Sequence, residues 1–233
     1  MLAPAHGSSH KDRVRIVIVE DHVMFREVLR KICEKDLRHE VVGEAGDGRT
    51  AVDLVSRCKP DFVLLDLILP NLYGFGVAGE IRRLSPATRI LVLSSHCDEY
   101  TVFRTEKAGV QGFVDKNTNS VEALKEAITA VAAGGTSFSE EYQRVRRARQ
   151  VNPVSFDKLL TNRERAIVAL VGESLTDEEI AARLGISVAS ASKHRLNTLH
   201  KLGLSSTIEL SRYARDHGFT LSAPRSGDDV MLP

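Results

Sequence analysis

Residues 61–66 read DFVLLD, and this short stretch decides the fold class. Its apolar residues follow one another without alternation, which is typical of a strand buried on both faces of a parallel sheet. A second such run, VRIVIV at 14–19, leads directly into the acidic pair Glu20-Asp21. Each run is therefore predicted to be a central strand that ends in a carboxylate.

Three further β-rich runs extend the pattern on both sides of residues 61–66. The predicted strands span 14–19, 41–45, 62–65, 90–93 and 112–114. Between them and after the last, apolar residues recur at helical spacing over 23–37, 50–58, 74–84, 100–107 and 121–132. Five strand-helix units predict an α/β domain with a doubly wound, five-stranded parallel sheet of the flavodoxin-like kind.

The second half of the chain contains helical signals only. Helices are predicted over 162–171, 177–184, 188–202 and 207–217, with capping boxes formed by Thr161 and Glu164 at the first and by Thr176 and Glu179 at the second. The predicted organisation is a flexible leader (1–12), an α/β domain (13–135), a linker (136–157), a small all-α four-helix domain (158–219) and a disordered tail (220–233). The linker carries a basic cluster of Arg144, Arg146, Arg147 and Arg149. The simpler interpretation of this cluster is a solvated surface, and the alternative is contact with DNA phosphates.

Composition excludes several classes of protein. The 233 residues are 42% hydrophobic and 27% charged, as in an ordinary globular protein. No run approaches the roughly 18 apolar residues needed to span a membrane, and the N-terminus has no secretory signal. The three cysteines are widely spaced and odd in number, which indicates neither a disulfide framework nor a zinc site. We expect a cytoplasmic protein that does not contact membranes.

Polar side chains follow the predicted strands at one edge of the sheet. Glu20 and Asp21 follow the first strand, Asp66 the third, Ser94 the fourth and Lys116 the fifth. Ligands bind at this carboxyl edge in open α/β sheets. Three close carboxylates repel one another, and a hard cation such as Mg²⁺ (or Mn²⁺) relieves that repulsion. With the charge balanced, Asp66 is the best candidate for a nucleophile that attacks a phosphoryl donor.

Residues 14–135 resemble a two-component receiver domain, and VVGEAGDGRTAVDLVSRCKPDFVLLDLILPNLYGFGV resembles the NarL/FixJ subfamily in particular. The resemblance implies that a sensor histidine kinase phosphorylates Asp66. It also implies that Asp21, Asp66 and the Ile68 backbone carbonyl hold the metal, with Glu20 assisting through water. Ser94 and Phe113 match the family's switch positions, and Lys116 matches its phosphate-binding lysine.

Three features depart from the common receiver pattern. Ile68 is apolar where many receivers have a polar residue, so we predict that it shields the acyl phosphate and slows its hydrolysis. Asp115 precedes Lys116 and is expected to weaken the attraction of the lysine for phosphate. Several glycines, Gly74 and Gly76 among them, weaken the start of the third helix, because each interior glycine costs about 1 kcal/mol.

Residues 176–187 predict a helix-turn-helix unit whose second helix enters the major groove. Residues 160–218 resemble the LuxR-type DNA-binding domain through LTNRERAIVALV, EEIAARLGIS and KHRLNTLHKLGL. The candidate DNA contacts are polar residues of the second helix: Ser187, Ser190, Ser192, Lys193, Arg195, Asn197 and Lys201. The resemblance implies that the fourth helix mediates homodimerisation, either on phosphorylation or on DNA with inverted half-sites. The candidate dimer contacts are Ile208, Leu210 and Ser211.

The recognition helix departs from the family where lysine is usual, because Ser192 stands there and Lys193 follows it. Residues 158–220 hold nine Lys and Arg against seven Asp and Glu, which predicts weak non-specific DNA affinity. A helical dimerisation module that has lost DNA binding is the alternative interpretation of this domain.

The leading hypothesis is a two-component response regulator, a DNA-binding transcription factor that is not an enzyme. One rival is a constitutive DNA-binding regulator with a degenerate receiver, against which the complete polar set argues. A second rival is a phosphatase-like enzyme of haloacid-dehalogenase type. That chemistry requires an aspartate two residues after the nucleophile, where this chain has Ile68.

Overall fold

The computed structural model describes residues 13–70, 74–118 and 120–221. The predicted leader and residues 222–233 of the predicted tail lie outside the described residues. A single sheet of parallel strands runs in the order β2-β1-β3-β4-β5-β6. Its strands are β1 (Arg15–Val19), β2 (Glu40–Ala45), β3 (Phe62–Asp66), β4 (Arg89–Ser94), β5 (Gly112–Asp115) and β6 (Ser137–Phe138).

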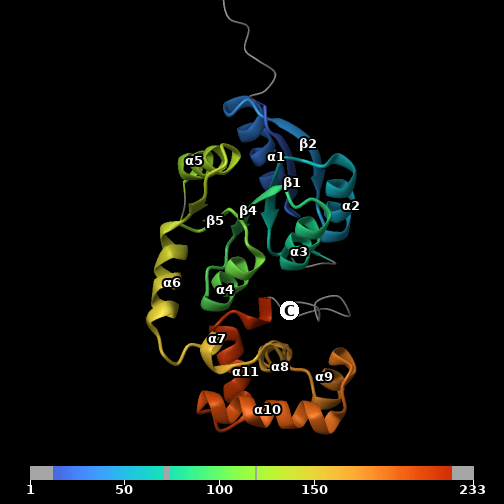
Figure 1. Ribbon diagram of the computed structural model, residues 1–233, viewed down its shortest axis with the longest axis vertical. Helices are drawn as coiled ribbons and strands as arrows, with labels where there is room; N and C mark the ends of the chain where they lie inside the picture. The colour runs from blue at the N-terminus through green and yellow to red at the C-terminus, as the bar shows by residue number, and fades with distance from the viewer. Residues whose placement is uncertain (1–12, 71–73, 119, 222–233) are drawn as a thin grey trace, which may run out of the picture.

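Helices cover both faces of the sheet, as the apolar runs predicted (Figure 1). The helices of this half are α1 (Val23–Lys31), α2 (Gly48–Cys58), α3 (Gly74–Leu84), α4 (Glu99–Ala108) and α5 (Val121–Ala132). Alternate residues of β1 enter opposite cores, because strand side chains alternate between faces. Val17 and Val19 pack on the side of α2, α3 and α4. Ile16 and Ile18 pack on the side of α1 and α5.

The polar segment between the predicted domains is more ordered than a simple linker. Residues 136–157 contain β6, which pairs with β5, and the helix α6 (Glu140–Val151). Tyr142 of α6 is buried in the receiver-side core, with its ring 5.0 Å from that of Phe113. The first helix also differs from its predicted extent, since α1 ends at Lys31 and a π-helical turn, η2 (Ile32–Asp36), follows.

Gly74, one of the glycines at the start of the third helix, begins α3 where there is no room for a side chain. A Cβ atom at Gly74 would lie 2.5 Å from the carbonyl oxygen of Asp66 and 2.6 Å from the Cα of Leu67. The Gly74 amide donates to the Leu67 carbonyl oxygen at 3.0 Å. The start of α3 therefore packs directly against the backbone that carries Asp66, an approach that only glycine permits.

The C-terminal domain consists of α7 (Phe156–Leu159), α8 (Asn162–Gly172), α9 (Asp177–Leu184), α10 (Val188–Leu202), α11 (Thr207–Asp216) and the 3₁₀ turn η3 (Phe219–Leu221). Both predicted capping boxes are present, at Thr161 with Glu164 and at Thr176 with Glu179. Gly185 ends α9 in the left-handed conformation that permits the tight turn into α10. The helix-turn-helix unit is thus confirmed.

An aromatic cluster joins the two domains. Tyr100 and Phe103 of α4 belong to the same buried cluster as Phe156 and Phe219 of the C-terminal domain. The Tyr100 amide donates to the carbonyl oxygen of His217 at 3.2 Å. Figure 1 shows the ends of α7 and α11 beneath α4.

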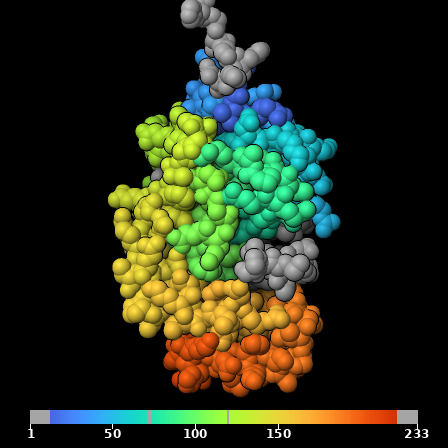
Figure 2. All heavy atoms as spheres, in the orientation of Figure 1, coloured from blue at the N-terminus to red at the C-terminus, as the bar shows by residue number. Residues whose placement is uncertain are grey.

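The helix α6 forms a second connection between the halves of the molecule. Figure 2 shows its yellow atoms along one side, from the receiver to the C-terminal domain. Buried Arg149 pairs with Glu106 of α4 and with Asp157 of α7. Arg146 adds a 2.7 Å ion pair to Glu106. Arg144 pairs with Glu141 of the same helix, so acidic side chains engage three of the four arginines in the basic cluster. Across the described ranges, no helix combines the length and apolar character that crossing a membrane requires.

Candidate functional site: an acidic pocket and an exposed helix face

The acidic pocket lies where the strand order reverses between β1 and β3. Glu20 and Asp21 follow β1, and Asp66 is the last residue of β3. One carboxylate oxygen from each lies within 4.8 Å of the other two. Glu20 is 1% exposed and Asp66 5% exposed, whereas Asp21 faces solvent. The structure therefore brings together all three acidic residues that the sequence placed at this edge.

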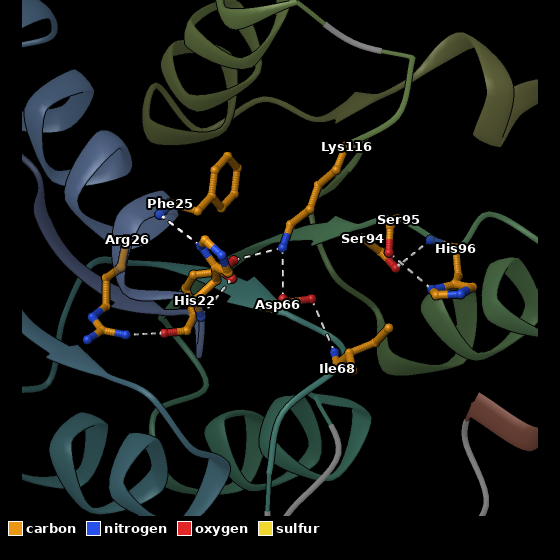
Figure 3. A network of polar contacts seen from close by, with 10 residues as sticks. His22, Phe25, Arg26, Asp66, Ile68, Ser94, Ser95, His96 and Lys116 are labelled. Atoms are coloured by element: carbon orange, nitrogen blue, oxygen red, sulfur yellow. Dashed lines mark hydrogen bonds and ion pairs between the residues drawn. The ribbon is translucent and has the colours of Figure 1, made fainter.

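Lys116 reaches into this pocket from the end of β5 (Figure 3). Its Nζ lies 2.7 Å from Glu20 Oε2 and 2.7 Å from Asp66 Oδ2. The ring of Phe25 lies 4.8 Å from the same ammonium group. Sequence reasoning missed Phe25, because no local signal shows that α1 and the end of β5 meet at this pocket.

The local backbone positions both buried carboxylates. The amide of His22 donates to Glu20 Oε1 at 3.2 Å, and the amide of Ile68 donates to Asp66 Oδ1 at 3.1 Å. Arg26 donates to the carbonyl oxygen of Glu20 at 2.5 Å. Burial, and then the charge of Asp66, raise the pKa of Glu20 above its usual range.

The donor set of the pocket fits a hard divalent cation. Its oxygen ligands come from sparse carboxylates, one of them open to solvent, which suits a metal that retains several waters. A cation there would also offset the repulsion between Glu20 and Asp66 that raises the pKa of Glu20. Glu20, Asp21 and Asp66 are the side chains that could hold it.

Ser94 and Phe113 lie beside the pocket and inside the core respectively. Ser94 ends β4, next to β3 in the sheet, and is fully buried. Its Oγ accepts a hydrogen bond from the amide of His96 at 3.1 Å (Figure 3). Phe113 is also fully buried, with its ring against Tyr142 of α6. A shift of Ser94 toward Asp66 would therefore break its hydrogen bond to the β4–α4 loop.

Two departures seen in the sequence have clear positions. Ile68 lies two residues after Asp66 and is 38% exposed. The Asp115 carboxylate accepts hydrogen bonds from the Asn117 amide at 3.0 Å and the Thr118 hydroxyl at 2.9 Å. Asp115 therefore stabilises the turn after β5, whereas Lys116 pairs with Glu20 and Asp66.

The candidate DNA-contacting residues do not share one environment in α10. Lys193 and Asn197 are exposed, and Ser187 caps the helix by accepting the Ser190 amide at 3.1 Å. Arg195 instead forms a two-pronged ion pair with Asp177 of α9, at 2.9 and 2.7 Å. The guanidinium therefore braces α10 against α9, and a contact of Arg195 with DNA stays a prediction.

The remaining candidates of α10 and α11 lie in different environments. Lys201 is engaged within the domain, because its Nζ lies 2.8 Å from Glu164 Oε2. Ser192 is half-buried at the edge of the exposed face. The structure corrects the assignment of Leu210 to a dimer contact, since Leu210 is fully buried in the domain core. Ile208, at 75% exposed, and half-buried Ser211 stay as candidates for that contact.

Comparison with known proteins agrees with both halves of this arrangement. Residues 16–129 match the response regulator receiver domain, and residues 158–214 match the bacterial regulatory proteins of the luxR family. The chain belongs to the NarL/FixJ-type response regulators. Two curated relatives show the same span. The transcriptional regulatory protein MctR of Rhizobium johnstonii is 32% identical over 90% of this regulator and 97% of its own length. The nitrate/nitrite response regulator NarP of Escherichia coli is 34% identical over 83% and 91%.

Solved structures extend the similarity to the fold. A LuxR-family response regulator from Aurantimonas sp. is 31% identical, with a TM-score of 0.56, over 60% of this regulator and 99% of that chain. RcsB of Salmonella enterica, solved bound to a promoter in the presence of a phosphomimetic, has a TM-score of 0.65 at 22% identity, over 86% and 98%. This regulator thus combines a receiver with a LuxR-type DNA-binding domain, as response regulators of transcription do.

Proposed function

We propose that Asp66 accepts a phosphoryl group from a sensor histidine kinase and that this modification controls DNA binding by the C-terminal domain. The supporting observation is the position of Lys116, whose Nζ lies 2.7 Å from both Asp66 and Glu20 in a buried acidic pocket. An ammonium group so placed can stay bound to Asp66 while it also contacts an incoming phosphoryl oxygen.

The transfer is a substitution at phosphorus. An Asp66 carboxylate oxygen forms the new O–P bond while the P–N bond to the kinase histidine breaks, and the electron pair leaves with the imidazole, which takes up a proton. Asp66 Oδ1 is oriented by the Ile68 amide and Oδ2 by Lys116. Both contacts hold the acceptor in place before the donor arrives, which lowers the entropic part of the barrier.

Charge in the pocket must be balanced during the transfer. A Mg²⁺ or Mn²⁺ ion held by Asp21, Asp66 and the Ile68 carbonyl, with Glu20 assisting through water, would neutralise developing charge on the phosphoryl oxygens. Once phosphate is present, Ser94 would donate its hydroxyl to it and release the His96 amide, which changes the loop before α4. Phe113, buried behind that loop, would follow.

We propose that this chain acts in the cytoplasm as a regulator and not as an enzyme. Phosphoryl uptake and slow hydrolysis at Asp66 change its own state and convert no external substrate. The phosphatase-like alternative lacks the acid that its chemistry needs, since Ile68 occupies that place.

DNA would be bound by homodimers on inverted half-sites, through the exposed face of α10. Lys193 and Asn197 are competent to contact phosphates and base edges, with the serines at the start of the helix beside them. Ile208 on α11 is an exposed apolar residue suited to a contact between two copies.

The decisive experiment is intact-mass analysis and peptide mapping after incubation with acetyl phosphate and Mg²⁺. Wild type is expected to gain one phosphoryl group at Asp66, and Asp66→Asn none. DNA binding by wild type should rise on phosphorylation, while Asp66→Asn should not respond. If neither protein is modified by acetyl phosphate or by a phosphorylated kinase domain, the constitutive-regulator alternative replaces this proposal.

A further inference from the structure

One side of α10 is left uncovered by both domains. Five of its residues, spaced three and four positions apart or adjacent, are exposed with both domains present: Ala189, Lys193, Leu196, Asn197 and His200. Residues at these intervals share a single helix face. The opposite side packs into the domain through buried Ala191, Thr198 and Leu199 and through Arg195 on Asp177. The exposed face is therefore the surface that α10 can present to DNA.

Leu196 is the one large apolar side chain among the five residues of this face. It is 57% exposed, in contrast to Leu199, which is 8% exposed in the domain core. Its neighbours on the face are Lys193, Asn197 and His200, all of which can hydrogen-bond to phosphates or bases. An isolated exposed leucine carries little meaning elsewhere on a protein surface. In the middle of a helix face that enters the major groove, however, an exposed leucine restricts which base edge can lie opposite it.

The major groove presents only one apolar group, the C5-methyl of thymine. The edges of guanine, adenine and cytosine present carbonyl, ring nitrogen or amino groups. A leucine pressed against one of these would remove water from a polar atom without replacing its hydrogen bond, which costs free energy. Against a thymine methyl the same side chain buries apolar surface on both partners.

We infer that Leu196 is a specificity-determining residue that reads the methyl group of one thymine in each half-site. The inference rests on the DNA contact proposed above for α10. In this arrangement Lys193 and Asn197 flank the leucine and supply the phosphate and base-edge hydrogen bonds. Leu196 adds the preference for thymine at one position, which polar side chains alone supply less well.

The test removes the methyl group from the DNA and the isobutyl group from the protein. Duplexes are first selected from a random pool by the full-length protein after acetyl phosphate treatment. Each thymine of the selected half-site is then replaced by deoxyuracil, one at a time, and affinity is measured at fixed salt. Deoxyuracil keeps the base pair and its hydrogen-bonding groups, so it reports on the methyl group alone.

We expect one position per half-site where wild type binds deoxyuracil about fourfold more weakly, the factor expected for losing one buried methyl contact. Leu196→Ala should bind the thymine duplex more weakly by a similar factor and should not distinguish deoxyuracil from thymine there. Val151→Ala is the matched control, because Val151 is an aliphatic residue on α6 that is 80% exposed, more than Leu196. It should retain the wild-type sensitivity.

The inference is overturned if wild type is indifferent to every replacement, or if Leu196→Ala remains sensitive at the same position. Circular dichroism of the variant checks that α10 is still formed. If wild type selects no sequence at all, the proposed DNA contact fails and this inference fails with it. Selective binding without sensitivity to the methyl group contradicts only the role of Leu196.

Discussion

The rings of Tyr100 and Phe219 are stacked with their centroids 4.1 Å apart, although Tyr100 belongs to the receiver and Phe219 to the end of the DNA-binding domain. Phe156 completes the contact, with its ring 5.6 Å from Tyr100 and 5.0 Å from Phe219. The apolar core of the C-terminal domain is thus continuous with one face of α4. This contact joins the two domains more directly than the covalent connection through α6.

Replacing Tyr100 with alanine should separate the domains. The ring is 5% exposed and packs mainly on residues of the other domain, so its loss should cost about 3 kcal/mol of interdomain stability. Small-angle X-ray scattering should show a larger radius of gyration for Tyr100→Ala, and urea should unfold its two domains in separate transitions. Val151→Ala, at an exposed position on α6, should change neither. A scattering profile identical to that of wild type would contradict the prediction.

Gly218→Ala tests the same interface through the backbone. Gly218 has φ of +77°, and a Cβ there would lie 1.9 Å from the carboxyl carbon of Asp98. The variant should therefore lose more than about 1 kcal/mol of unfolding free energy. Asp98 caps α4 by accepting the Thr101 amide at 2.8 Å, and serine can replace that function. Adding Asp98→Ser should restore part of the loss, whereas strain at φ alone would leave the double variant no better than the single one.

Glu20→Gln should stabilise the metal-free, unphosphorylated protein at neutral pH. The pKa of Glu20 is raised by burial and by Asp66, so the folded chain holds this proton more tightly than the unfolded chain does. The contribution of Glu20 to stability is therefore fully present below its ordinary pKa of 4.5 and is lost as pH rises through the folded value. Urea unfolding from pH 4 to pH 8 should show the advantage of Glu20→Gln growing with pH. An advantage that shrinks toward neutral pH would have the wrong sign.

Ile68→Asn should shorten the lifetime of the phosphoryl group. The Ile68 amide contacts Asp66 and its side chain is partly exposed, so we expect that side chain to exclude water from the acyl phosphate, whereas asparagine can orient a water molecule. Phosphorylated wild type and variant, freed of donor by gel filtration, can be followed by intact mass over time. Ile68→Val is the conservative control and should resemble wild type. If Ile68→Asn loses phosphate no faster, shielding by Ile68 is not what sets the lifetime.

Arg195 and Lys193 should differ in what their loss affects. Arg195→Ala breaks a partly exposed ion pair to Asp177 and should cost about 1 kcal/mol of stability. Asp177→Ala should cost about the same, and the double variant little more than either. Lys193→Ala should leave stability unchanged, weaken DNA binding, and reduce the salt slope by about 1. The reverse pattern would place Arg195 on the DNA and Lys193 in the fold.

The sequence predicted those parts of the fold that local patterns encode. Short β-rich runs, two of them nearly continuous in apolar residues, marked the five main strands, and the capping pairs Thr161/Glu164 and Thr176/Glu179 marked two helix starts. Strand β6 was missed because two residues carry no periodic signal. The contacts of Arg149 with Glu106 and Asp157 could not be predicted, since ion pairs between distant segments leave no mark in local sequence.

The acidic pocket was predictable because parallel strands deliver their ends to one edge of the sheet. Side-chain direction on the C-terminal helices was predicted less well. Helical spacing places Arg195 on the same side as Ala191 and Leu199, and Leu210 on the same side as Ala214, so this signal was present. Residue type alone had suggested DNA and dimer contacts there. Tyr100 and Phe103 could equally have belonged to the receiver core, which concealed the interdomain contact.

The outward position of the exposed face of α10 has a kinetic consequence. Lys193, Asn197 and His200 are exposed while the two domains remain in contact, and Figure 1 shows α10 at the end of the molecule remote from the sheet. Docking of the receiver therefore does not close this helix to DNA. We expect copies that have received no signal to spend time on the chromosome already, held by weak phosphate contacts. The delay between signal and transcription would then depend on how fast resident copies find one another, and not on a search that starts from free solution.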